Sequence, residues 1–138
     1  MIDNASMPRS TIIPVLRYAD VRGAVAWLTE HFGLRERLRI AEHRSQLTYG
    51  NGDLVVTTGV SVPGEQTLLV RVADVDAHFM HAQSRGVQIR STPETFAFGE
   101  RQYAALDCAG HVWTFSQSVV DVDPATWGGE TVALRDDR

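Results

Sequence analysis

The strongest constraint on the fold of this chain is a short pattern that occurs twice. Residues 17–21 and 71–75 both read Arg-x-Ala-Asp-Val. The runs that lead into them, TIIPVLRY and TLLVRV, are rich in the β-branched and large apolar residues typical of strands. Asp20 and Asp74 then stand where a helix N-cap belongs, because a carboxylate there accepts hydrogen bonds from the free N–H groups of the first turn. The pattern therefore predicts one strand-to-helix corner, made twice.

The order of segments after each corner is also repeated. Apolar residues at helical spacing fill 21–32 and 75–85, and a glycine follows each stretch. Strand-like runs come next in both halves. Asn51-Gly52 joins RSQLTYG to DLVVTTG, and this dipeptide is the strongest short hairpin signal; the turn CAG joins RQYAALD to HVWTFSQ. Residues 91–100, which contain a proline and a glycine, are expected to form a long loop.

This repetition predicts an α+β fold built from two βαβββ modules. The expected organisation is an N-terminal extension at 1–10, a first module at 11–62, a second module at 63–118 and a C-terminal tail at 119–138. Within the tail, Pro124 is placed to open a short helix.

Composition excludes several classes of function. All 13 basic residues are arginine, which rules out a Schiff-base lysine and a P-loop lysine. The single cysteine, Cys108, cannot form an internal disulfide. The net charge of −4, with scattered arginines, argues against nucleic acid. No apolar run approaches the ~20 residues of a membrane span and no signal peptide is evident, so no membrane partner and a cytoplasmic location are expected.

The end of the second half carries a family resemblance. GERQYAALDCAGHVWTFSQ resembles the Gly-Glu-Arg-x-Tyr and Asp-x-x-Gly-His-x-Trp-x-Phe pattern of small glyoxalase and bleomycin-resistance proteins, a branch of the vicinal oxygen chelate superfamily. The resemblance covers roughly residues 10–118 and extends to DVDPATWG in the tail. It implies a U-shaped sheet with a ligand cleft on its concave side, helices on its convex side, and a homodimer.

The resemblance also implies where a metal ion would be held. Metal-dependent members use four His, Glu or Gln ligands, one on each of four strands. The matching positions here are Ile13, Val56, Thr67 and Thr114. Two aliphatic and two hydroxyl side chains cannot offset the dehydration of a divalent ion. No metal and no other cofactor are therefore expected, with a divalent metal ion as the alternative.

Strand alternation and the resemblance together predict the lining of the cleft. An arginine at its rim would grip a carboxylate through two parallel hydrogen bonds, and aromatic rings would stack on a planar ligand. In glyoxalase I, the position that resembles Arg17 grips a carboxylate of the thiol cofactor. The predicted cleft residues are Ile13, Val15, Arg17, Leu54, Val56, Thr67, Leu69, Arg71, Phe96, Phe98, Arg101, Tyr103, Val112 and Thr114.

Two main functions fit these expectations. The first is a metal-free binding protein that encloses a planar or amphipathic small molecule, with antibiotic sequestration as one form. The alternative is a glyoxalase-type lyase, isomerase or dioxygenase that uses a metal, or His111 or Tyr103 as acid and base, with Asp107 orienting His111. A scaffold or regulatory module without a ligand is a third possibility. His78 and His81 are expected to be solvated residues on the convex side.

Overall fold

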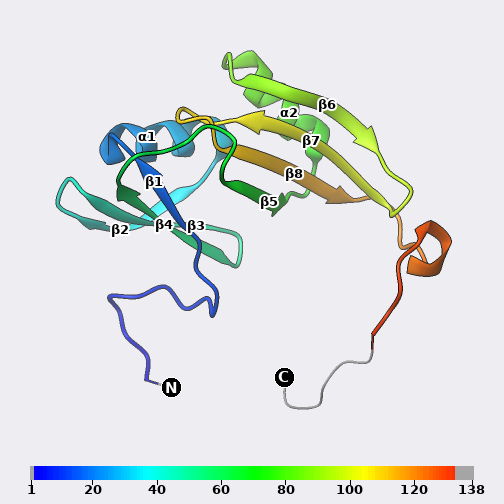
Figure 1. The fold of residues 1–138 in the computed structure, drawn as a ribbon, viewed down its shortest axis with the longest axis horizontal. Coiled ribbons are helices and arrows are strands. Elements are labelled where there is room, and N and C mark those ends of the chain that lie inside the picture. The colour runs from blue at the N-terminus through cyan, green and yellow to red at the C-terminus, as the bar shows by residue number, and fades with distance from the viewer. Residues whose placement is uncertain (1, 133–138) are drawn as a thin grey trace.

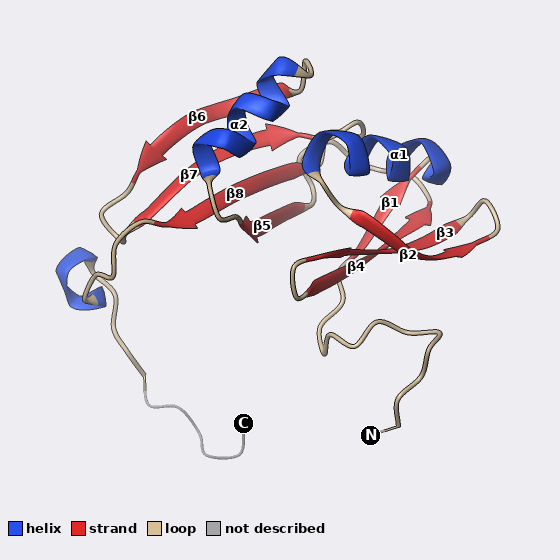
Figure 2. Ribbon diagram, turned by 180° about the vertical axis from the view of Figure 1, so that it is seen from behind, coloured by secondary structure: helices blue, strands red, loops and turns tan. Residues whose placement is uncertain are grey.

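Two four-stranded sheets and two helices form the core of the computed structural model, which describes residues 2–132 (Figure 1 and Figure 2). The first module comprises β1 (Val15–Tyr18), α1 (Val21–Phe32), β2 (Arg35–Ile40), β3 (Arg44–Tyr49) and β4 (Gly52–Thr58). The second comprises β5 (Thr67–Arg71), α2 (Val75–Ser84), β6 (Gln88–Thr95), β7 (Glu100–Leu106) and β8 (Val112–Ser118). A 3₁₀ helix, η1 (Pro124–Trp127), follows. The predicted α+β fold with paired βαβββ modules is confirmed.

The two sheets have the same topology. Their strand orders are β1-β4-β3-β2 and β5-β8-β7-β6, with the first pair in each sheet parallel and the other pairs antiparallel. Both helices lie on one side of the sheets (Figure 2). We call the opposite side of each sheet its open face.

The strand-to-helix corners form as the repeated pattern predicts. The Asp20 side chain accepts a hydrogen bond from the Gly23 N–H at 2.9 Å, and Asp74 accepts one from the Ala77 N–H at 3.0 Å. These bonds satisfy donors that the first turn of a helix leaves free. Gly33 ends α1 with a φ of 82°, a conformation that costs glycine little.

A single hydrophobic core joins the modules on the helix side of the sheets. Phe32, at the end of α1, packs on Trp113 and Phe115 of β8, with ring centroids 5.3 and 4.9 Å apart. The buried Asp107 carboxylate adds a polar bridge, because it accepts hydrogen bonds from the Tyr18 hydroxyl at 2.5 Å and from Trp113 Nε1 at 2.9 Å. The modules therefore depend on each other for burial.

Two strands differ from the sequence-based expectation. β2 was not predicted. Its sequence, RERLRI, is rich in charged residues and lacks a typical strand pattern, although every second residue is partly buried. β6 runs through most of the predicted loop 91–100 and leaves only residues 96–99 between strands. Pro93 is tolerated there because β6 is the edge strand of its sheet, where a missing N–H need not break a ladder hydrogen bond.

The chain before β1 crosses the open face of the first sheet. Figure 1 shows this segment below β1 and β4, on the side away from α1. We call residues 4–10 the N-terminal arm. Separately, no helix within residues 2–132 is long and apolar enough to cross a membrane.

Candidate ligand-binding site

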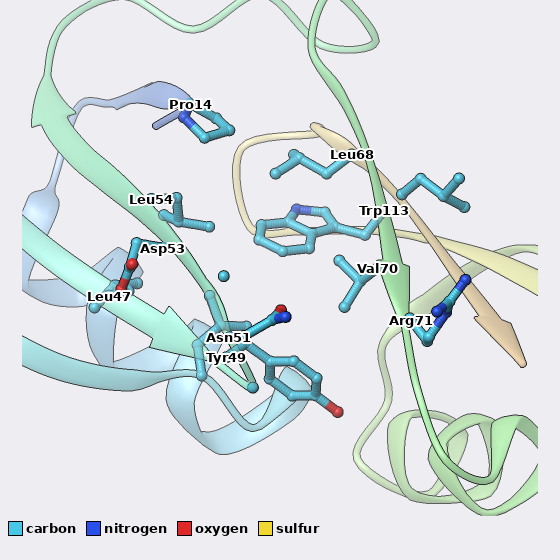
Figure 3. A pocket seen from close by; sticks show the side chains of 14 residues that line it. Pro14, Leu47, Tyr49, Asn51, Asp53, Leu54, Leu68, Val70, Arg71 and Trp113 are labelled. Carbon is cyan, nitrogen blue, oxygen red and sulfur yellow. The ribbon is translucent and has the colours of Figure 1, made fainter. Parts of the chain in front are cut away.

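A cavity of about 430 Å³ lies between the two modules, and we call it the seam pocket. Its volume falls within the range of small-molecule sites, roughly 300–1,000 Å³. Figure 3 shows side chains of both modules converging on it from opposite sides. Its apolar walls come from Leu34, Leu47 and Leu54 of the first module and from Leu68, Val70 and Trp113 of the second.

Strand alternation explains how β5 and β8 line this pocket. Leu68 and Val70 lie on the helix side of β5, while Leu69 and Arg71 lie on the open face and border the pocket from there. Trp113 is fully buried on β8, and its indole N–H is already bonded to Asp107. The indole therefore forms part of the pocket wall and has no unsatisfied donor.

Polar groups are confined to the edge of the pocket. The hairpin of β3 and β4 supplies Tyr49 at the end of β3, Asn51 in the turn and Asp53 in β4. The end of β5 supplies Arg71 (Figure 3). Partial burial raises the pKa of Tyr49, so its phenol stays protonated at neutral pH and can donate a hydrogen bond. The pocket thus joins a hydrocarbon interior to a rim that carries a cation, a carboxylate and two neutral polar groups.

The predicted cleft residues divide into several groups. Leu54, Leu69 and Arg71 line the seam pocket. A second group lies on or beside the open faces and consists of Ile13, Val15, Arg17, Thr67 and Thr114. Those on β1 and β5 are solvent-exposed, and Thr114 is half-buried. Val112 is buried in β8.

The predicted facing of β4 is wrong by one residue. β1 and β4 pair in the register Val15↔Val55 and Leu16↔Val56, so Val55 shares the open face with Val15. Leu54 and Val56 belong instead to the core on the helix side. A slip of one residue moves every side chain of a strand to the other face, and the sequence alone did not fix this register.

Two residues predicted for the cleft point toward the helices. Tyr103 is 1% exposed and pairs with Phe115, which fixes it on the helix side of β7. Arg101 forms hydrogen bonds and an ion pair with Asp76 of α2, with its Nη2 3.0 Å from Oδ1. Both were predicted to line the cleft, but they lie in β7, where strand alternation directs them to the other side.

The predicted stacking residues Phe96 and Phe98 lie elsewhere, at the tip between β6 and β7. Their rings are stacked with centroids 5.4 Å apart, and Phe98 also contacts Trp127 of η1 at 5.5 Å. Phe98 borders a separate cavity of about 490 Å³, formed with Glu100 and residues 118–122. Neither ring reaches the seam pocket.

The histidines and their partners also differ from expectation. The His111 ring is 1% exposed, and its Nε2–H donates to the Arg17 carbonyl at 3.0 Å. Asp107 accepts from the backbone N–H of His111 and does not orient its ring. His78 is not a solvated surface residue, because its Nδ1 accepts from the Tyr103 hydroxyl at 2.5 Å and its Nε2 faces the Phe32 carbonyl at 3.3 Å.

The residues at the metal positions implied by the resemblance do not fit a divalent ion. Ile13, Thr67 and Thr114 offer no carboxylate or imidazole, and replacing Val56 by its open-face neighbour Val55 supplies none either. Across residues 2–132, no three His, Cys, Asp or Glu side chains come together in an arrangement that could hold a metal ion.

Sequence reasoning missed most of the pocket. Asn51 was predicted only as part of a hairpin turn, and Tyr49, Leu68 and Trp113 were not among the predicted ligand residues. The hairpin forms, but its two-residue turn is Gly50-Asn51, because Gly52 already pairs with Tyr49. Nothing in a local pattern indicates that this turn faces β5 of the other module. Only the packing of one module on the other reveals the pocket.

Comparisons with known proteins agree with the fold. The family model Glyoxalase/Bleomycin resistance protein/Dioxygenase superfamily matches residues 12–115. The solved structure of TioX from Micromonospora sp. ML1 is 32% identical, with a TM-score of 0.69, over 83% of this chain and 100% of that one. Lactoylglutathione lyase from Agrobacterium tumefaciens is similar in fold at 16% identity, with a TM-score of 0.66, over 88% and 99% of the two chains.

A search of the curated proteins found no match. The family model nevertheless spans most of the sequence, and the 32% identity to TioX extends over the whole of that chain. The chain therefore belongs to the Glyoxalase/Bleomycin resistance protein/Dioxygenase superfamily.

Proposed function

We propose that this protein binds a planar, largely apolar small molecule in the seam pocket. The observation that carries the proposal is the pocket itself, about 430 Å³ in volume and walled by leucine, valine and tryptophan side chains. Removing about 200 Å² of apolar ligand surface from water would contribute about 5 kcal/mol before the costs of association. Burial of apolar ligand surface can therefore supply binding free energy without a covalent bond to the protein.

Arg71 gives the ligand a preferred chemistry and orientation. Arg71 borders the pocket at the end of β5, and a guanidinium can donate two parallel hydrogen bonds to a planar anion. Tyr49 and Trp113 supply aromatic surface with little rotamer entropy to lose. The favoured ligand is therefore an aromatic compound that carries a carboxylate, a sulfonate or a similar acceptor.

Sequestration, as in a resistance protein, is favoured over catalysis by the chemistry of the lining. Glyoxalase-type chemistry would need a metal ligand set or a free acid–base pair beside the ligand. His111 and Tyr103 are both engaged in internal hydrogen bonds, and neither lines the seam pocket. The expected homodimer and the cytoplasmic location stay predictions, the first of which light scattering of the purified protein tests.

The proposal can be tested with the fluorescent aromatic sulfonate 1-anilinonaphthalene-8-sulfonate as the probe. Val70→Trp fills the pocket, and we expect it to weaken binding by about tenfold or more. Val60→Trp adds the same ring at a position that is 85% exposed and outside the pocket, and it should bind like the parent. Equal affinities in both variants would reject the seam pocket as the site.

A second comparison tests the role of Arg71. Arg71→Gln should weaken binding of the sulfonate while leaving the affinity for its neutral relative, N-phenyl-1-naphthylamine, unchanged. Equal weakening of both probes would show that the arginine acts through packing and not through charge.

A further inference from the structure

The N-terminal arm is attached to the open face of the first sheet. Gln46 Nε2 donates a hydrogen bond to the Ser6 carbonyl at 2.8 Å, and Arg37 Nη2 donates one to the Ala5 carbonyl at 3.2 Å. Gln46 and its strand neighbour Val55 are only 4% and 3% exposed, although they face away from the helices. Pro8 is buried as well. The arm therefore covers this face of the sheet.

The end of the arm reaches the rim of the seam pocket. The Ser10 hydroxyl donates to the Asp53 carboxylate at 2.6 Å and lies 3.5 Å from the Asn51 carbonyl oxygen. Asp53 and Asn51 both line the pocket, and so does Pro14, which continues the chain into β1. A hydrogen bond to an ionised carboxylate is stronger than a neutral one, so Ser10 ties the turn between β3 and β4 to the arm.

Within residues 2–132, no corresponding segment is attached to the second module. Gln46 pairs with Val55 in the first sheet, and the matching pair in the second sheet is Ala104 with Thr114. Alanine has no side-chain donor for a backbone carbonyl. On that open face Leu69 is 69% exposed. The arm is therefore an addition to one copy of the duplicated scaffold, placed where that copy meets the pocket.

We propose that the N-terminal arm is a strap that holds the β3–β4 turn at the mouth of the seam pocket, with Ser10 as its positioning residue. This inference rests on the proposed function. While Ser10 is bonded to Asp53, the rim is fixed and a bound ligand leaves slowly. When the bond breaks, the turn can move away from β5 and the pocket opens.

The test compares dissociation rates of 1-anilinonaphthalene-8-sulfonate, measured by stopped-flow dilution. Ser10→Ala should release the probe about three- to tenfold faster than the parent, as expected for the loss of one charged hydrogen bond. Ser10→Thr keeps the hydroxyl and should restore the parental rate. Gln46→Ala, which loosens the arm away from the pocket, should also accelerate release.

Ser84→Ala is the matched control, because that exposed hydroxyl bonds only within α2, to the His81 carbonyl. It should leave the rate unchanged. Hydrogen exchange supplies a readout without any ligand: the amides of residues 50–52 should exchange faster in Ser10→Ala than in the control.

The outcomes separate the strap from the pocket. An unchanged release rate in Ser10→Ala, with probe binding still lost in Val70→Trp, would overturn the strap and leave the proposed function standing. A lower melting temperature in Ser10→Ala without faster release or exchange would mean that the serine is merely structural, which also overturns the strap. Undiminished probe binding by Val70→Trp would remove both proposals.

Discussion

The two modules share a topology but bury their helices to different depths. α1 has five buried residues, Val21, Ala24, Val25, Leu28 and Phe32. α2 has two, Val75 and Ala82. α1 covers its own sheet and also sends Phe32 onto β8 of the second module. α2 contacts α1 through polar groups, including His81 Nε2, 3.0 Å from the Glu30 carbonyl.

This difference shows how a duplicated fold divides its tasks. The strand-to-helix corners and strand orders are the same in both copies, because the βαβββ scaffold needs them. The first helix provides much of the shared core, whereas the second carries polar contacts. Substitutions in the two helices should therefore have unequal effects on stability where burial differs and equal effects where only the scaffold is involved.

The largest effect is expected at Phe32. Phe32→Ala removes a fully buried ring from the contact between modules and should cost about 3–5 kcal/mol of unfolding free energy. Phe79→Ala, on the partly buried face of α2, should cost about 1–2 kcal/mol. Urea denaturation measures both. Similar losses in the two variants would contradict the unequal division of the core between helices.

A smaller and symmetrical effect is expected at the helix caps. Asp20→Ala and Asp74→Ala should each cost about 1 kcal/mol, because each removes one cap hydrogen bond of similar length. The double variant should show the sum, since the two caps share no partner. The measurement is again urea denaturation, and a clearly unequal pair would show that the corners are not equivalent.

The smallest effect is a pH dependence that arises from His78 of the second module. Burial lowers the pKa of His78 below its ordinary value, so the unfolded chain binds this proton more readily than the folded one. Its contribution to stability is complete above about pH 6.5 and falls as the pH drops through that value toward the lowered folded pKa. The residue 54 positions earlier is Ala24, which cannot titrate.

Melting temperatures between pH 8 and pH 5 test this. In His78→Gln the melting temperature should fall less steeply as the pH drops, because glutamine does not titrate. Its amide can still accept from Tyr103 and donate to the Phe32 carbonyl, so the fold is kept. His43→Gln, at an exposed position, is the control and should keep the parental slope. A decline identical in the parent and His78→Gln would assign the pH dependence to other groups.

Local patterns were enough to predict much of the fold. The repeated corner, the Asn-Gly hairpin and the helix ends all act through contacts within a few residues. The facing of β4 could not be predicted so reliably, because it depends on whether β1 aligns with Val55 or with Val56. β2 was not predicted because arginines occupy its exposed positions, and the alternation of polar and apolar residues typical of a strand is therefore weak.

The candidate site was less predictable than the fold. Leu54, Leu69 and Arg71 were among the predicted ligand residues and do line the seam pocket. Their neighbours there come from a turn and a strand that are distant in sequence. The attachment of the arm through Gln46 and Ser10 is likewise a tertiary feature, for which the polar residues near the N-terminus give no local signal.

The inner edges of the two sheets, β1 and β5, are not hydrogen-bonded to each other within the described chain. The hydrogen-bond ladder of each sheet is complete within its own module. A shift of one module relative to the other would therefore strain side-chain contacts and leave both ladders intact. The seam pocket lies along this line, where side chains and not a backbone ladder join the two sheets. The width of the pocket is therefore set by side-chain packing across the seam, and no strand has to lose its ladder for that width to change.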